Sequence, residues 1–242
     1  MDEQSSWKIN IKQADAAMSL KTWWALIFIY PLARPLTVFL VNKTNVSPNQ
    51  VTLTAIFFRF LTVCCFFVGD HSALSVGALF YYLAYVCDCT DGTVARIKRQ
   101  SSELGRYLDH ISDLVGDIII LIILAWSQGL LSQPLIWSMV ILHLCESYIS
   151  YLSGFSIKQN NGRLSDDYIF TKVNKYRNWW FRKNIKSFIS FPDYTAVIFV
   201  FFPLIGLPEI GLNFGLYLLL IILSYTIFST FVSLHTGESR FP

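Results

Sequence analysis

Apolar residues occur along this chain in long runs that short polar segments separate. Six of the runs extend for about 17 to 25 residues, the length with which an α-helix crosses roughly 30 Å of hydrocarbon. Apolar and polar positions do not alternate within these runs, so the pattern is not that of an outer-membrane barrel. We therefore predict six transmembrane helices, at residues 50–69, 72–95, 104–127, 134–157, 191–207 and 212–234.

The segment before the first predicted span, residues 20–41, is apolar and aromatic but contains Pro31 and Pro35. Two prolines so close together are expected to kink or stop a spanning helix, because proline lacks the backbone N–H and its ring clashes with the preceding turn. We therefore predict an amphipathic helix that lies in the membrane interface. A seventh span is the alternative.

Composition supports the membrane assignment. Hydrophobic residues make up 54% of the chain and charged residues only 14%, and the mean hydropathy of +0.47 exceeds that of soluble domains. Five cysteines lie in or beside the apolar runs without the paired spacing of a zinc site, and we expect free, packed thiols at Cys64, Cys65, Cys87, Cys89 and Cys145. The sequence predicts an all-α integral membrane protein.

The positions of Lys and Arg indicate which helix ends face the cytoplasm. Three connections contain neither residue: 69–71, 127–129 and 206–212. Every basic residue except Arg59 lies in the N-terminal region, the 96–106 junction, the loop after the fourth span or the C-terminal tail. The positive-inside rule makes these basic regions cytoplasmic, and six spans then place both termini in the cytoplasm.

The long loop at residues 158–189 combines Lys and Arg residues with Trp179 and Trp180. This composition suits a segment that rests on an anionic leaflet, with its rings at headgroup depth and its cations on phosphates. An ordinary basic loop explains the same composition equally well.

Four aspartates lie near the cytoplasmic ends of the second and third predicted spans. A charged side chain at membrane depth costs about 2.5–3.5 kcal/mol, so such residues are candidates for a function. On a helix Asp88 and Asp91 share one face, and Asp109, Asp113 and Asp117 share a face of the next helix. A helix hairpin can therefore bring two carboxylate faces together.

Carboxylates in such a cluster repel one another and need a positive charge between them. A divalent cation meets this need, and ligands that offer only oxygen atoms favour Mg²⁺, Mn²⁺ or Ca²⁺ over zinc. Because Mg²⁺ also binds substrate phosphate oxygens, the cluster suggests a phosphorylated substrate. Gly92, Ala95 and Gly105 leave space for a ligand beside the backbone, and Arg96 can bind a phosphate.

The stretch from Asp88 to Asp113 resembles the signature of the CDP-alcohol phosphotransferase (CDP-alcohol phosphatidyltransferase) family. That signature is D-x-x-D-G-x-x-A-R, then eight residues, then G-x-x-x-D-x-x-x-D. All fixed positions are filled here, by Asp88, Asp91, Gly92, Ala95, Arg96, Gly105, Asp109 and Asp113. The resemblance implies an enzyme of phospholipid biosynthesis that transfers a phosphoalcohol group from a CDP-alcohol to an acceptor hydroxyl and releases CMP.

The resemblance also implies roles for individual residues. Asp88, Asp91 and Asp109 would hold Mg²⁺ or Mn²⁺, and Asp113, in the same metal cluster, would be the general base that takes the acceptor proton. The nucleotide side would be lined by Gly92, Ala95, Arg96 and Gly105.

A second short motif, P-N-x-x-T at Pro48 to Thr52, resembles the segment that precedes the first span in this family. The resemblance places Asn49 and Thr52 at the nucleotide end of the cavity. A helix start, with Ser47 as its cap and Pro48 in its first turn, explains the same residues and is compatible with that role.

Polar residues deeper in the predicted spans are candidates for an acceptor or lipid pocket. Arg59 lies at about mid-depth, where we expect it to meet a carboxylate or a lipid phosphate, or to form a structural ion pair. Asp117 lies outside the family signature and either supports the metal ligands or is the next polar residue of a wet face. His143 and Glu146 share one helix face and either line the pocket or bond neighbouring helices.

We expect a cytoplasmic tail and interfacial helix at 1–46 and a six-helix catalytic domain at 47–242, with the 158–189 loop cytoplasmic. The resemblance implies a membrane-lipid enzyme with CDP-alcohol and hydroxyl substrates that forms a homodimer, and we expect no nucleic-acid partner. The length favours a CDP-diacylglycerol donor. Leu104-Gly105 and Asp109-His110 instead resemble choline and ethanolamine phosphotransferases, which use a soluble CDP-alcohol and a lipid acceptor.

Two classes without this activity are further alternatives. Aspartates and an arginine inside a helical bundle also occur in cation or proton-coupled transporters. The aspartates here cluster near the basic end instead of being spread across the membrane depth. A silent membrane scaffold would have no reason to keep four mutually repelling carboxylates.

Overall fold

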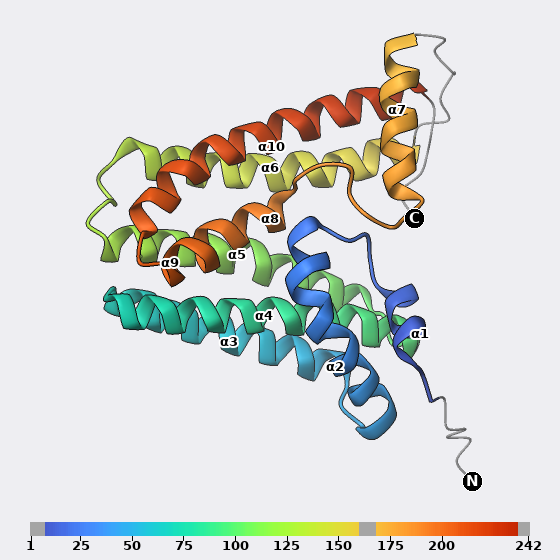
Figure 1. Cartoon of the computed structure of the whole chain (residues 1–242), viewed down its shortest axis with the longest axis horizontal. Helices are drawn as coiled ribbons and strands as arrows, with labels where there is room; N and C mark the ends of the chain where they lie inside the picture. Colours follow the sequence, from blue (N-terminus) through green and yellow to red (C-terminus); the bar gives the residue numbers. More distant parts are fainter. Residues whose placement is uncertain (1–7, 160–167, 237–242) are drawn as a thin grey trace.

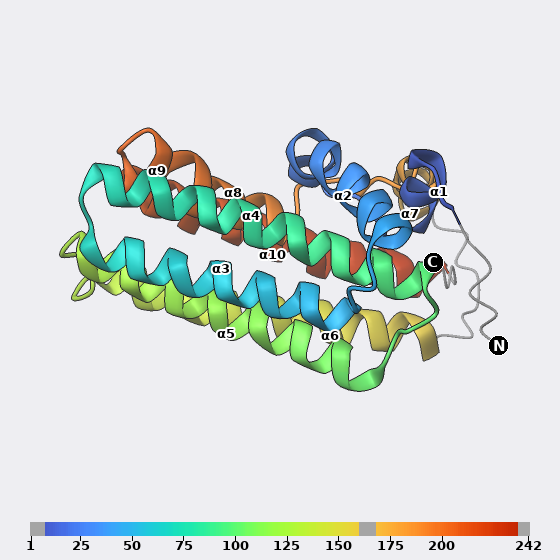
Figure 2. The same ribbon diagram turned by 90° about the horizontal axis from the view of Figure 1, so that it is seen from below.

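The computed structural model describes residues 8–159 and 168–236, and helices are the regular structure of both ranges (Figure 1). A bundle along the long axis contains α3 (Pro48–Val68), α4 (His71–Ile97), α5 (Glu103–Ser127), α6 (Pro134–Gln159) and α10 (Pro208–Thr236). Beside them run α8 (Phe191–Ala196), the π-helical turn η2 (Val197–Phe201) and α9 (Phe202–Leu204). Each of the six predicted spans is therefore helical. In Figure 2, α3 lies between α4 and α5.

By length and hydropathy, five helices are able to cross a membrane: 25–43, 48–68, 71–97, 134–157 and 208–235. Of the two other predicted spans, α5 is 25 residues long but contains the aspartates, and Phe191–Leu204 is apolar but shorter. These helices confirm the all-α integral membrane fold.

Local sequence explains where the long helices begin and end. Ser47 and Gln50 form a reciprocal capping box at the start of α3, with Pro48 in the first turn, as predicted. Asp70 caps α4 and Ser102 caps α5 through their side-chain oxygens. Gly69 ends α3 with a φ of 80°, a left-handed conformation that favours glycine.

The predicted interfacial segment forms the π-helical turn η1 (Ala25–Ile29) and α2 (Tyr30–Lys43). The expectation that Pro31 and Pro35 kink or stop a helix is wrong in part, because the helix continues through both. Pro31 lies in the first turn of α2 and directly follows the wider π turn, which relieves the loss of its N–H bond. In both ribbon views α2 runs obliquely across one end of the bundle, but Ala25–Lys43 is also long and apolar enough to cross a membrane, so the interfacial helix stays a prediction beside a further span.

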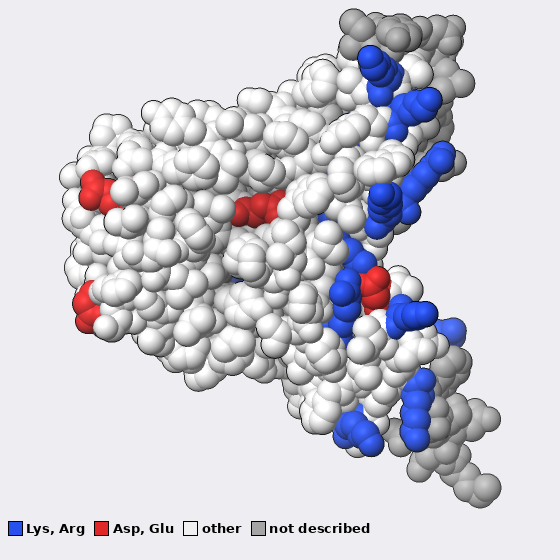
Figure 3. Space-filling model, in the orientation of Figure 1, with Lys and Arg blue, Asp and Glu red and all other residues white. Residues whose placement is uncertain are grey.

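Two more helices lie at the same end of the bundle, α1 (Ile11–Ala17) and α7 (Tyr168–Phe181). α7 forms part of the predicted 158–189 loop, of which residues 160–167 lie outside the described residues. Lys21 joins the N-terminal segment to the segment that follows α7. Its N–H donates to the Asn184 carbonyl at 3.0 Å, and its carbonyl accepts from Lys186 N–H at 2.8 Å. Lys and Arg side chains gather at this end (Figure 3).

The main apolar cluster lies in the other half of the bundle. On α5 it begins at Ile120, after Asp117, and it includes Phe66, Tyr194 and Phe199. Tyr81 packs edge-on against Phe199, with ring centroids 5.0 Å apart. The five cysteines are free thiols, as predicted. Two smaller apolar clusters lie at the basic end, one that contains Ile29 and Tyr30 and one that contains Val51 and Ala55.

Candidate functional site

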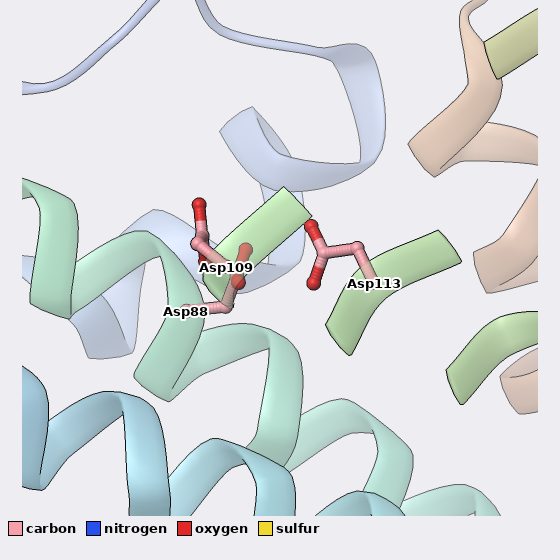
Figure 4. A group of neighbouring side chains, drawn as sticks. All are labelled: Asp88, Asp109 and Asp113. Atoms are coloured by element: carbon pink, nitrogen blue, oxygen red, sulfur yellow. The ribbon is translucent and has the colours of Figure 1, made fainter. Parts of the chain in front are cut away.

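Three of the four signature aspartates converge between α4 and α5. Carboxylate oxygens of Asp88, Asp109 and Asp113 all lie within 4.8 Å of one another (Figure 4). Oδ1 of Asp109 is buried without a hydrogen-bond partner, and Oδ1 of Asp113 is buried next to Arg59, its ion-pair partner. Three carboxylates so close together, with a single arginine beside them, fit a hard divalent cation, because it binds the free oxygen atoms and offsets the repulsion.

Asp91 lies one turn beyond Asp88 on α4, but its carboxylate points elsewhere. It is 5% exposed, and its Oδ2 accepts a hydrogen bond from the Thr52 hydroxyl at 2.5 Å. The structure therefore brings together the Asp88, Asp109 and Asp113 carboxylates, while Asp91 faces α3.

A cavity of about 380 Å³ adjoins the cluster at the basic end of the bundle. Asp91 and Asp109 belong to its lining, so it is continuous with the carboxylates. The same lining includes every residue that the resemblance assigns to the nucleotide side: Asn49, Thr52, Gly92, Ala95, Arg96 and Gly105.

Small residues keep this cavity open. A Cβ on Gly105 would lie 3.0 Å from Ser102 Oγ and 3.7 Å from Asn49 Oδ1. A Cβ on Gly92 would lie 3.4 Å from Arg96 Nη1. Either side chain would take space beside groups that could contact a ligand, so glycine serves a steric purpose at both positions.

Arg96 connects the cavity to the N-terminal segment. Its Nε donates to the Ala17 carbonyl at 2.6 Å and its Nη2 to the Thr93 hydroxyl at 3.3 Å. Ser19 also lines the cavity. Neither Ser19 nor the contact of Ala17 with Arg96 was predicted, because no local signal indicates a contact between residues 79 positions apart.

Arg59 meets a carboxylate, as expected. Its Nη1 lies 2.5 Å from Asp113 Oδ1 and 3.4 Å from Ser112 Oγ, and the residue is 8% exposed. Asp117, buried one turn further along α5, accepts a hydrogen bond from the Tyr81 hydroxyl at 3.0 Å. Arg59 thus orients Asp113, the predicted base. Asp117 is held by Tyr81 of α4.

His143 and Glu146 have different surroundings although both lie on α6. The His143 ring is buried edge-on against Phe191, with centroids 4.4 Å apart, and neither ring nitrogen has a hydrogen-bond partner. Glu146 instead lines a second cavity together with Lys186. Lys186 was not predicted as a site residue, because it shares a cavity with Glu146 only when the segment before α8 is folded against the bundle.

Comparisons with known proteins found similar sequences and a similar structure. The family model for CDP-alcohol phosphatidyltransferase matches residues 45–232. A CDP-diacylglycerol–inositol 3-phosphatidyltransferase from Arabidopsis thaliana is 29% identical over 102 residues, covering 41% of this chain and 45% of that protein. A CDP-diacylglycerol–glycerol-3-phosphate 3-phosphatidyltransferase from Rickettsia bellii is 33% identical over 78 residues, covering 31% and 43%. The matched region thus spans less than half the length of these relatives.

A solved structure has a similar fold. The crystal structure of phosphatidylinositol phosphate synthase from Mycobacterium tuberculosis with CDP-DAG bound aligns with a TM-score of 0.52 and 17% sequence identity. The alignment covers 88% of this chain and 99% of that chain. The membrane bundle described above is therefore shared across nearly the whole of that protein.

Proposed function

Because this chain belongs to the CDP-alcohol phosphatidyltransferase family, we propose that it transfers a phosphoalcohol group from a CDP-alcohol to an acceptor hydroxyl and releases CMP. The observation that carries the proposal is the contact between two features: the carboxylate cluster and the 380 Å³ cavity share Asp109. A nucleotide in the cavity would extend its pyrophosphate to the cluster.

Asp88, Asp109 and Asp113 would hold a divalent cation, Mg²⁺ or Mn²⁺, and Asp91 would complete the set from the cavity side. Such an ion neutralises charge on the pyrophosphate and on the departing CMP when it is bound. The closeness of the three carboxylates and the buried Asp109 Oδ1, which lacks a hydrogen-bond partner, support this assignment.

Asp113 is the proposed general base. The acceptor oxygen forms a bond to the phosphorus of the phosphoalcohol group, the bond from that phosphorus to the CMP oxygen breaks, and the hydroxyl proton passes to Asp113. Arg59, in contact with Asp113 Oδ1, fixes the orientation of the carboxylate. Asn49, Thr52, Gly92, Ala95, Arg96 and Gly105 would surround the nucleotide.

We propose CDP-diacylglycerol as the donor. The similar proteins from Arabidopsis and Rickettsia are both named for CDP-diacylglycerol. The soluble CDP-alcohol and lipid acceptor of choline and ethanolamine phosphotransferases are the competing pair, and a donor comparison separates the two.

The proposed orientation places both termini and the opening of the nucleotide cavity in the cytoplasm. Support comes from the Lys and Arg residues at the end where α1, α2 and α7 lie (Figure 3). Residues 1–46 would form the tail and interfacial helix, and residues 47–242 the catalytic domain. A homodimer is part of the proposal, and the mass of the purified protein in detergent tests it.

The test of the proposed function is CMP release by the purified protein in lipid vesicles with Mg²⁺ or Mn²⁺. CDP-diacylglycerol and CDP-choline are offered separately with a set of hydroxyl acceptors, and Asp113→Asn is the matched variant. Metal-dependent CMP release that Asp113→Asn abolishes supports the proposal. Folded protein that releases no CMP from either donor argues against it.

A further inference from the structure

A second cavity, of about 320 Å³, lies between α6, α10 and residues 181–190. Two of its lining residues are charged, Glu146 on α6 and Lys186 before α8. Eight others carry hydroxyl groups, among them Ser150, Ser187 and Tyr225. The family signature contains none of these residues, yet their chemistry is that of a site for a polar ligand.

The two charged groups remain separate within the cavity. Glu146 is 5% exposed, and its Oε1 accepts a hydrogen bond from the Ser150 hydroxyl at 2.7 Å. Burial lowers the pKa of Lys186, while the charges of Glu146 and Asp193 oppose that shift. None of the ion pairs between described residues joins Lys186 to Glu146. A ligand can therefore contact both charges.

The second cavity adjoins the proposed nucleotide cavity. Leu20 lines the second cavity and Ser19 lines the first, so neighbouring residues border the two spaces. The backbone hydrogen bond from Lys186 N–H to the Lys21 carbonyl, 2.8 Å long, fixes the second cavity against this segment. Its occupant would therefore lie beside the donor.

We propose that the second cavity binds the acceptor, and that the acceptor is a small hydroxyl compound that carries no phosphate. This inference rests on the proposed function, because it assumes that an acceptor exists. The charge balance in the cavity favours this chemical class.

One lysine and one glutamate give the described part of this lining no net charge. A phosphate monoester brings between one and about two negative charges, and a single ammonium group beside a buried carboxylate cannot offset them in a medium of low dielectric constant. A neutral polyol or a zwitterion keeps the balance, and the hydroxyl groups of the lining can donate to it and accept from it. A lipid acceptor would bury the charges of Glu146 and Lys186 against apolar surface, at a cost that the hydrogen bond from Ser150 to Glu146 offsets only in part.

The experiment uses the full chain in vesicles with CDP-diacylglycerol and Mn²⁺. Acceptors are offered in matched pairs: glycerol and glycerol 3-phosphate, inositol and inositol 1-phosphate, serine and phosphoserine. CMP release is measured for each, and the Tm shift that each compound causes is measured without donor. Glu146→Gln removes the repelling charge, and Glu209→Gln, at an exposed position in the first turn of α10, is the control.

We expect an unphosphorylated compound to give the highest CMP release, about tenfold or more above its phosphorylated partner. Glu146→Gln should reduce this ratio several-fold, and Glu209→Gln should not. A preference for a phosphorylated compound, or a ratio that Glu146→Gln leaves unchanged, overturns the inference.

The Tm measurement separates failure of this inference from failure of the proposed function. If no donor and acceptor pair releases CMP, the proposed function fails and the Tm shifts alone decide the inference. Stabilisation by an unphosphorylated compound, lost in Lys186→Met, then supports a polar site for such ligands. Absence of any such stabilisation, or greater stabilisation by the phosphorylated compounds, overturns it.

Discussion

Arg59 of α3 and Asp113 of α5 form an ion pair inside the bundle, with Nη1 of the arginine 2.5 Å from Oδ1 of the aspartate. Gly116, on the next turn of α5, makes room for the arginine, since a Cβ there would lie 3.3 Å from Arg59 Cδ. The pair places one fixed positive charge beside a cluster of negative ones. It therefore links the stability of the bundle to the site.

Replacing Arg59 by methionine should destabilise the protein and increase its dependence on metal. Asp113 would lose its partner, and removal of one member of a buried pair costs about 3–5 kcal/mol, less where a partner is half-exposed as Asp113 is. We expect a lower Tm in metal-free detergent and a larger Tm rise on addition of Mn²⁺ than in the wild type, because the ion replaces the lost charge.

Lys12→Met, at an exposed position of α1, is the control for loss of one positive charge. Equal Tm rises with Mn²⁺ in the wild type and Arg59→Met would contradict a cation site next to Asp113.

Replacing an aspartate of the cluster by asparagine should have an effect that depends on the proposed role of that aspartate. Asp113→Asn removes the proposed base, and general base catalysis contributes about 10²- to 10⁴-fold to rate, so CMP release should fall by that factor. Asp88→Asn removes a proposed metal ligand and should weaken Mn²⁺ binding, measured by electron paramagnetic resonance, as well as CMP release.

The ratio of the two effects distinguishes the roles. If Asp113→Asn and Asp88→Asn weakened Mn²⁺ binding equally while Asp113→Asn retained most of its turnover at saturating metal, Asp113 would be a ligand only.

Gly105→Ala should impair donor binding more than turnover. The new methyl group would lie 3.0 Å from Ser102 Oγ, at the cavity wall. We expect the KM for the CDP-alcohol to rise about tenfold, equivalent to roughly 1.4 kcal/mol, with a smaller change in kcat. Steady-state CMP release measures both constants.

Ser138→Ala, on the exposed face of α6, should change neither constant. A lower kcat at unchanged KM for Gly105→Ala would mean that this wall does not contact the donor.

Asp15 should make the N-terminal segment sensitive to acid. Partial burial raises the pKa of Asp15, but the hydrogen bonds and charges of Lys21 and Arg34 outweigh it and hold the pKa below its usual value. Both bases lie 2.7 Å from the carboxylate. The stabilisation is therefore present above the unfolded pKa of about 3.9 and is lost as the pH falls through the lower folded pKa.

Asp15→Asn removes this contribution. The Tm difference between wild type and Asp15→Asn should be largest near neutral pH and should shrink below about pH 4. A difference that stays constant between neutral pH and pH 3 would contradict the assignment.

The sequence predicted the bundle because apolar runs of membrane length permit little besides helices. The spacing of the aspartates along two neighbouring helices was equally informative about the site. Asp88, Asp109 and Asp113 converge, as the helical periodicity indicated. The residues that the family resemblance assigns to the nucleotide also share one cavity, since they lie at neighbouring ends of three consecutive helices.

Contacts between distant segments were not predictable. Asp91 turns to Thr52 because α3 packs beside it, and rotation about its side chain leaves no trace in the sequence. Likewise, Ala17 meets Arg96 and Lys186 enters the second cavity only through the docking of chain segments far apart in sequence. Pro31 was misjudged because the π turn before it is a local adjustment that composition does not encode.

The arrangement of Ser19 and Leu20 bears on the order of events in catalysis. One short length of backbone borders both cavities and is tied to Arg96 through Ala17 and to Lys186 through Lys21. Movement of this partition toward one space enlarges the other. An occupant that widens its own cavity would then narrow the other, so donor and acceptor would influence each other's binding through this segment.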